Sequence, residues 1–277
     1  FFIKRYLESI FPDYRDEDPF DIAEVSGLLL NIESYGNIFR YPYFYTGDPV
    51  PEEAELYTLA NKLAYGLDAF PTEPTTQFHG TPEDYVYSEL GIPALAYAIG
   101  SSSEGQYFMN CGDFEEELNA NLNMLIRAAK ASFAPYSLPA GPEITNLSIQ
   151  SRIENGQTLW QLSAVAKTNL YRFPTYPSPI GASAVYSFDF TPWQEGAVLY
   201  DIQPEDGSWD KAEEALFAEL EVSTLQPGQH RVYVQAALED GTAGLASAGT
   251  ITIHPEPLPT PTPIVAEHYN YLPLINK

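Results

Sequence analysis

The segment LGIPALAYAIG, residues 90–100, decides the fold of the first half of the chain. A Gly-Ile-Pro turn precedes the apolar run at 94–99, and a short apolar run after a turn predicts a buried strand. The run GLLLNI, residues 27–32, follows a Ser-Gly turn and predicts a second buried strand.

Helical spacing of apolar residues surrounds these two strands. It appears over residues 1–11, which end before a proline, over 52–67, which follow a proline, and over 114–133. Strands that alternate with helices predict an α/β domain over residues 1–136, in which flanking helices cover a mixed, mostly parallel sheet.

Residues 140–255 show a different pattern. Apolar and polar residues alternate at 144–149, 159–165, 185–190 and 230–236, and Asn-Gly, Asp-Gly and Pro-Gly pairs separate these runs. Such spacing predicts an all-β sandwich. The segment LQPGQHRVYV, residues 225–234, resembles the strand entry of fibronectin type III and immunoglobulin-like domains. That resemblance implies that Tyr233 closes a corner of the sandwich by bonding to the backbone.

Residues 256–277 follow as a linker and tail. A Pro/Thr-rich spacer at 256–263 favours an extended polyproline conformation. The end, YNYLPLINK at 269–277, resembles short tails of bacterial surface proteins. Attachment to the cell surface and a frayed terminus both remain open.

Composition limits the partners and the compartment. The formal net charge is −25, so nucleic acid and anionic membranes would be repelled. The one cysteine, Cys111, allows no intrachain disulfide, and no apolar run approaches the roughly 20 residues that span a bilayer. Phe1 is neither an initiating Met nor the start of a signal-peptide pattern. We therefore expect a processed piece of an extracellular or cell-surface protein, with sequence missing upstream.

Three segments, in order, carry a resemblance to a known family. NIESYGNIFRYPYFYT (31–46) is similar to a strand that ends in His-Ser-Tyr and continues to Tyr-Pro-Trp/Tyr-Gly-Tyr-Thr. GTPEDYVY (80–87) resembles Ser-Gly-x-x-x-Asp-Trp-x-Tyr, and residues 90–100 resemble Leu-Gly-Ile-Pro-x-x-Thr-Phe-Glu-Leu-Gly. These patterns are those of zinc carboxypeptidases. The resemblance implies that residues 1–136 form roughly the back half of that catalytic domain, whose cofactor is zinc.

The resemblance also assigns family positions to four residues. Glu33 stands where the family has its third zinc ligand, a histidine, and Ala98 stands where it has its general-base glutamate. Thr76 falls at the position of the mobile active-site tyrosine. Glu83 falls on the floor of the substrate side-chain pocket, where an acid would favour a basic ligand side chain. The family's remaining ligands, a His-x-x-Glu pair, and its carboxylate-binding arginines lie upstream of this chain.

The residues of the first domain are poorly suited to zinc chemistry. A catalytic zinc needs about three protein ligands and an open position for water. Residues 1–136 contain one histidine, His79, which suits a turn better than a metal, and one cysteine. An alanine at 98 cannot take a proton from water, and general bases commonly contribute roughly 100- to 10,000-fold. Glu33 ligates zinc, accepts backbone hydrogen bonds at the end of its strand, or pairs with Arg40.

Two further alternatives concern single positions. Glu83 is either a pocket residue or a solvated or helix-capping acid. The tryptophans of the second domain, Trp160, Trp193 and Trp209, are either stacking platforms for a glycan or core residues.

We expect a secreted protein of the zinc carboxypeptidase family that has lost catalysis and holds no zinc. Its ligand, if it has one, would be a peptide or protein C-terminus. One alternative is an active metallocarboxypeptidase that works once the upstream half is present. The other is a cell-surface or glycan-binding module that acts through the β-sandwich.

Overall fold

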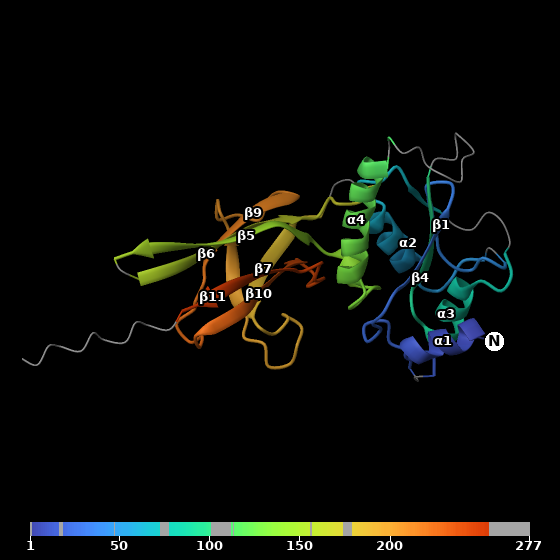
Figure 1. The fold of residues 1–277 in the computed structure, drawn as a ribbon, viewed down its shortest axis with the longest axis horizontal. Helices are drawn as coiled ribbons and strands as arrows, with labels where there is room; N and C mark the ends of the chain where they lie inside the picture. Colours follow the sequence, from blue (N-terminus) through green and yellow to red (C-terminus); the bar gives the residue numbers. More distant parts are fainter. Residues whose placement is uncertain are drawn as a thin grey trace, which may run out of the picture.

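A computed structural model describes residues 2–16, 19–46, 48–72, 78–100, 112, 114–155, 157–173 and 179–254. Figure 1 shows an α/β half, which contains the N-terminus, beside a half built from strands. Two hydrophobic clusters match this division, because residues 7–138 supply nearly all of the first cluster and residues 144–251 supply the second. None of the described helices is long and apolar enough to cross a membrane.

The α/β half is built on a four-stranded sheet in the order β1-β4-β2-β3. Two of its three strand pairs are parallel, β1 with β4 and β2 with β3, whereas β2 and β4 are antiparallel. The predicted mixed α/β content is therefore confirmed. The strands are β1 (Leu29–Ser34), β2 (Ile38–Arg40), β3 (Phe70–Thr72) and β4 (Ala94–Ile99). The helices are α1 (Phe2–Ile10), α2 (Glu53–Leu63), α3 (Pro82–Leu90) and α4 (Phe114–Ala131).

Alternation along β4 assigns the two faces of this sheet, because successive side chains of a strand point to opposite sides. Tyr97 lies on the face covered by α4, where its hydroxyl interacts with Asn121 and its ring stacks on Phe39 with centroids 4.2 Å apart. The small residues Ala96 and Ala98 lie on the other face. Helix α3 covers that face, since Asn31 of β1 donates to Glu83 of α3.

Helix α3 has clear start and stop signals. Thr81 is its N-cap, and the Thr81 hydroxyl oxygen accepts from the backbone N–H of Asp84 at 3.2 Å. Gly91 ends the helix with φ of +73°, a left-handed conformation that favours glycine. A Cβ atom on Gly91 would also lie 2.8 Å from the ring of Phe20, so the position admits no larger residue without a shift.

The second half is an antiparallel arrangement of seven strands in the order β11-β10-β7-β8-β9-β6-β5. An all-β second half is thus confirmed, but its layers are connected. Strand β8 pairs with β7 through residues 200–202 and with β9 through residues 203–204, so one sheet curls into a near-barrel. The strands are β5 (Glu143–Glu154), β6 (Gln157–Lys167), β7 (Gly181–Phe188), β8 (Tyr200–Pro204), β9 (Glu213–Glu219), β10 (Gly228–Leu238) and β11 (Ser247–Ile253).

Tyr186, and not Tyr233, is the tyrosine that bonds to the backbone beyond the end of β9. The Tyr186 hydroxyl accepts from the N–H of Glu221, just after β9, at 2.9 Å, and Tyr186 is buried. The Tyr233 hydroxyl instead lies 3.5 Å from the guanidinium of Arg231, on the outer surface. The sequence pattern predicted this role for a tyrosine of β10, whereas the buried tyrosine that reaches the backbone just after β9 belongs to β7.

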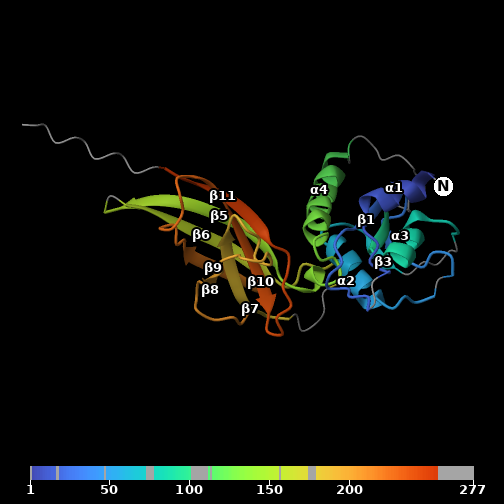
Figure 2. The ribbon, with the colours of Figure 1, turned by 90° about the horizontal axis from the view of Figure 1, so that it is seen from below.

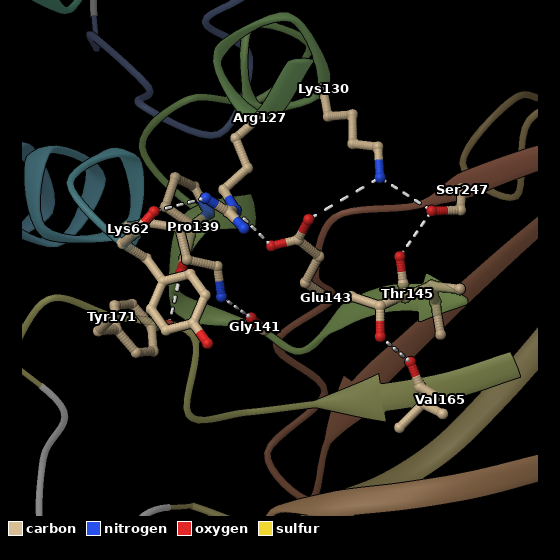
Figure 3. Close-up of polar contacts among 12 residues, drawn as sticks. Lys62, Arg127, Lys130, Pro139, Gly141, Glu143, Thr145, Val165, Tyr171 and Ser247 are labelled. Carbon is tan, nitrogen blue, oxygen red and sulfur yellow. Dashed lines mark hydrogen bonds and ion pairs between the residues drawn. The ribbon is translucent and has the colours of Figure 1, made fainter. Parts of the chain in front are cut away.

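Buried charges join the two halves, as Figure 3 shows. Arg127 of α4 donates to Glu143 at 2.8 Å, and both side chains are nearly inaccessible. Lys62 of α2 is fully buried, donates to the carbonyl of Gly141 at 3.0 Å and lies 4.3 Å from the ring centre of Tyr171. These contacts hold α2 and α4 against the start of β5, so the two halves have a fixed orientation.

Candidate functional site

Strands β1 and β4 place Glu33 beside Ala98. The two residues are Cα partners in the parallel register, and Ile38 of β2 pairs with Ala98 from the other side. Ala98 is 2% exposed. The positions assigned to a metal ligand and to a general base thus meet on one face of the sheet, which is the face covered by α3.

The Glu33 carboxylate is held by an arginine of the neighbouring sheet region. Oε1 of Glu33 lies 3.5 Å from Nη1 of Arg40, the last residue of β2. Arg40 pairs with Ala96 in the β2–β4 register, so its side chain lies on the same face as Glu33. Of the alternatives for Glu33, the ion pair with Arg40 is therefore the one that the structure contains.

Glu83 is a buried acid beneath this face. It is 2% exposed, and its Oε1 accepts from Nδ2 of Asn31 at 2.7 Å. Burial raises the pKa of Glu83, and the nearby charge of Glu33 raises it further. The alternative of a solvated or capping acid is wrong, because Thr81 caps the helix.

The acid next to Glu83 has a different task. Both oxygens of Asp84 accept from backbone N–H groups, Phe44 at 2.8 Å and Tyr45 at 3.1 Å. Asp84 therefore ties the loop after β2 to the start of α3. In this loop the Pro42–Tyr43 peptide bond is cis, and so is Ser34–Tyr35 at the end of β1.

A second buried network lies under α3 and escaped sequence reasoning. The guanidinium of Arg15 donates to both oxygens of Glu52 at 3.3 Å, and the hydroxyl of Tyr87 donates to the same carboxylate. Burial together with the Glu52 charge raises the pKa of Tyr87 well above its usual range. Tyr43 packs edge-on against Tyr87 at 5.5 Å. The available signal was Arg15 itself, an isolated cation in a segment rich in acids.

The remaining predicted positions do not join the Glu33 site. Thr76 and Cys111 lie outside the described residues, as does the tail from 255 onward. His79 is exposed in a bend. Glu33 is paired with Arg40, and among the described residues it belongs to no group of three His, Cys, Asp or Glu side chains that could hold a metal ion.

A possible metal-binding group among the described residues occurs elsewhere, in the β half. Asp206, Asp210 and Glu214 bring their carboxylates within 4.8 Å of one another. The ammonium group of Lys211 forms ion pairs with all three. A protein cation therefore already balances this acidic cluster, and the cluster lies in the other half of the molecule from Glu33.

The three tryptophans have different surroundings. Trp193 contacts Phe133 with ring centres 4.4 Å apart and ring planes tilted by 36°, and Trp209 packs against the second core and against Gly181. Trp160 also borders that core, but it lines an open groove of about 450 Å³ between the β5–β6 hairpin and β11. Trp160 is thus both a neighbour of the core and part of the groove lining.

Comparisons with known proteins give no family. No model of a protein family matches the chain, and no curated protein matches it. Among solved structures, the endo-beta-1,4-mannanase from Thermotoga petrophila aligns with 72% of this chain and 35% of its own length. The identity is 9% and the TM-score 0.26, a likeness too weak to carry an argument about fold or function.

Proposed function

We propose that this chain is a secreted, catalytically degenerate member of the zinc carboxypeptidase family. The proposal rests on three ordered motifs in residues 31–100 and on one juxtaposition. Glu33 and Ala98, assigned from separate motifs, are direct neighbours in adjacent parallel strands. The observation that supports the loss of catalysis is that the Glu33 carboxylate lies beside Ala98 and Arg40.

The physical reason is the charge and chemistry of this face. An enzyme of this family needs a base next to its metal, and removal of a general base typically costs roughly 100- to 10,000-fold in rate. Ala98 supplies no proton acceptor. The guanidinium of Arg40 lies 3.5 Å from Glu33 and would repel a zinc ion brought to that carboxylate.

A retained binding role suits the same face better than turnover. Glu83 and Glu33 together make the region acidic, and burial disfavours the charge on Glu83. A peptide C-terminal residue with a basic side chain would compensate that charge. We propose a peptide or protein C-terminus as the ligand class.

Zinc content and peptide release test this proposal. The purified protein, together with any sequence that precedes Phe1 in its gene, is analysed for zinc and incubated with peptides ending in Phe or Lys. We expect far less than the roughly one zinc per chain of a catalytic site, and no released amino acid. About one zinc per chain, with release that a chelator stops, would establish the active metallocarboxypeptidase instead.

The fine fold of the β half is part of the proposal. We assign an immunoglobulin-like or fibronectin type III-like domain. Strands β5, β6, β9 and β8 have the neighbours of an ABED layer, and β7, β10 and β11 have those of a CFG layer.

A cell-surface glycan-binding role is the second candidate, and the groove beside Trp160 is the observation that favours it. Indole rings commonly present one face to a ligand while the polar edge is satisfied. Binding of the whole chain on a glycan array, abolished by Trp160→Ala, would support this role. Signals that persist in the variant would reject this groove as the site.

A further inference from the structure

Two grooves meet on strand β11 of the β half. One is the groove of about 450 Å³ beside Trp160, which we call the Trp160 groove. The other has a volume of about 270 Å³, and we call it the Arg231 groove. It is lined by Asp189, Gln229, Arg231, Tyr233 and Thr250. Thr250 lines both grooves, so a ligand in one groove can continue into the other across β11.

The Trp160 groove exists because β5 and β11 separate along their length. These strands are the two ends of the seven-strand order and run beside each other, as Figure 2 shows. They are in close contact at Gly249, since a Cβ atom there would lie 2.8 Å from the side chain of Ile149. Farther along both strands, Ser151 and Ile153 of β5 and Thr252 of β11 line the groove. Regular strands therefore frame the groove, so it is formed before a ligand arrives.

The Arg231 groove lies on the outer face of the β half. Side chains alternate along β10, so Arg231 and Tyr233 point outward while Val232 between them is buried. Gln229 lies on the same side of the strand as Arg231. Thr250 of β11 is the Cα partner of Arg231 in the β10–β11 ladder. Polar side chains of two adjacent strands thus converge in this groove.

The charge of Asp189 in this groove is already balanced. Its Oδ2 atom lies 2.7 Å from Nδ1 of His230, and its Oδ1 atom accepts from the backbone N–H of Arg231 at 2.9 Å. Nε2 of His230 lies 2.7 Å from the carbonyl oxygen of Gln226. Because both ring nitrogens face acceptors, both carry a proton and the ring is an imidazolium. The contacts with Asp189 and Gln226 also raise the pKa of His230.

Arg231 therefore gives the groove a net positive charge. Its guanidinium lies 3.5 Å from the Tyr233 hydroxyl, and no carboxylate of the described residues forms an ion pair with it. A guanidinium presents several N–H donors in a fixed fork, and the Gln229 amide and Thr250 hydroxyl add further donors. A groove that is positive and rich in donors suits a carboxylate group, whose oxygens only accept.

We propose that the β half binds a glycan that carries a single acidic sugar. A neutral part of the glycan packs the C–H face of a sugar ring against the indole of Trp160. The glycan crosses β11 at Thr250, and the carboxylate of its acidic sugar binds the guanidinium of Arg231. This inference rests on the glycan-binding role proposed for the Trp160 groove, and it adds a second subsite and a class of ligand.

The charge of the whole chain restricts the ligand to few acidic groups. A polyanionic glycan meets repulsion from the formal net charge of −25 along its whole length. A single carboxylate responds mainly to charges within the Debye length, about 8 Å at physiological salt, and Arg231 is the nearest of these. The acidic chain and the positive groove together select a glycan with one carboxylate.

A glycan array followed by calorimetry tests the proposal. The 277-residue chain is applied to an array of neutral glycans, glycans with one uronate or sialate, and polyuronates. The mono-acidic glycan that binds most strongly is then titrated beside its neutral parent. We expect the acidic member of this pair to bind about tenfold more tightly, the lower end of the range for a hydrogen bond to a charged group. Polyuronates should bind more weakly than the mono-acidic glycan.

Three variants separate the two subsites, and circular dichroism checks that each is folded. Arg231→Ala should weaken binding of the acidic glycan about tenfold and leave the neutral parent unchanged. Trp160→Ala should abolish binding of both. Arg152→Ala is the matched control, because this exposed arginine pairs with Glu219 and lies between two groove-lining residues of β5, so it points to the other face of the strand. Its affinities should equal those of the wild type.

The possible failures have different meanings. If the wild type shows no preference for the acidic glycan, or Arg231→Ala weakens both probes equally, the carboxylate subsite is rejected and the glycan role of Trp160 stands. Binding to no glycan at all rejects both proposals. Strongest binding to a polyuronate contradicts the limit on ligand charge. A neutral peptide and its C-terminal amide are titrated as well. If the free acid binds more tightly than any glycan and Arg231→Ala removes this preference, the groove is a peptide site and the proposal is wrong.

Discussion

Substitution of Lys62 by methionine is the sharpest test of the junction between the two halves. Lys62 is fully buried, and its ammonium group donates to the carbonyl of Gly141 and lies over the ring of Tyr171. Burial lowers the pKa of Lys62 from 10.5 to about 8, although the charge of Glu143 partly opposes this. Methionine has a similar length and removes the charge.

The pKa difference sets the size and the sign of the effect. A shift of about 2.5 units corresponds to roughly 3 kcal/mol at 1.36 kcal/mol per unit. Between pH 8 and 10.5 the unfolded chain binds a proton at Lys62 that the folded chain has lost. Stability therefore rises with pH across this window, and below pH 8 the full penalty is present.

The difference between the two proteins isolates Lys62, because other groups titrate alike in both. At pH 7.5 the Lys62→Met variant escapes the burial penalty but leaves the Gly141 carbonyl unpaired, a loss of about 1–3 kcal/mol. The free energies of unfolding should then agree within about 2 kcal/mol. By pH 10.5 the difference should move by about 3 kcal/mol in favour of the wild type.

Urea unfolding at pH 7.5, 9 and 10.5, followed by circular dichroism, measures these free energies. Lys4→Met is the matched control, since Lys4 is exposed on α1. The difference in free energy of unfolding between Lys4→Met and the wild type should not shift in favour of the wild type as the pH rises. Parallel pH profiles for the wild type and Lys62→Met would refute a buried, charged Lys62.

Three more predictions follow from buried or constrained positions, each measured by the same unfolding assay. Arg127→Ala should cost about 3–5 kcal/mol because it strands the buried charge of Glu143, whereas Arg152→Ala, at an exposed ion pair, should cost about 1 kcal/mol or less. A small loss in Arg127→Ala would mean that water solvates Glu143. Gly91→Ala should cost about 1–2 kcal/mol, since alanine disfavours φ of +73° and its Cβ would meet a ring; an unchanged midpoint would disprove the steric argument. Glu83→Gln should increase the free energy of unfolding above about pH 5. Burial raises the pKa of Glu83, so the wild-type protein loses stability as the pH rises from the unfolded-state pKa to the folded-state pKa, and glutamine avoids this loss. A variant that is less stable at neutral pH would contradict a burial penalty on Glu83.

Long elements with clear boundaries were predictable from the sequence. The apolar runs at 27–32 and 94–99 correspond to β1 and β4, and the helical spacing at 114–133 corresponds to α4. The Asn-Gly pair separated two predicted strands, and Glu154 does pair with Gln157 across it. These segments have local signals: periodicity, turn residues and caps.

Short and non-local features were not predictable in the same way. Strands β2 and β3 have three residues each, too few to show a period, and they exist because β4 and each other supply partners. Strand β8 has five residues and connects the two β layers, because it pairs with a strand of each layer. No local sequence pattern encodes which partners such a short strand takes. Tertiary pairing decides such elements.

The site shows the same division. Glu33 and Arg40 are seven residues apart in one motif, and their ion pair was one of the alternatives that the sequence left open. The Arg15–Glu52 contact joins a loop to a helix start 37 residues away, so no spacing rule reveals it. The burial of Glu83 was also hidden, because an acid near a helix start usually faces solvent.

Helix α4 is held in place from two sides. Tyr97 contacts it from the sheet, and Arg127 and Lys130 attach it to Glu143 of the β half. A helix held in this way cannot roll to bury its exposed apolar side chains, Leu118 and Leu122 among them, against its own sheet. Their exposure therefore follows from the fixed placement of α4 and not from loose packing of the helix.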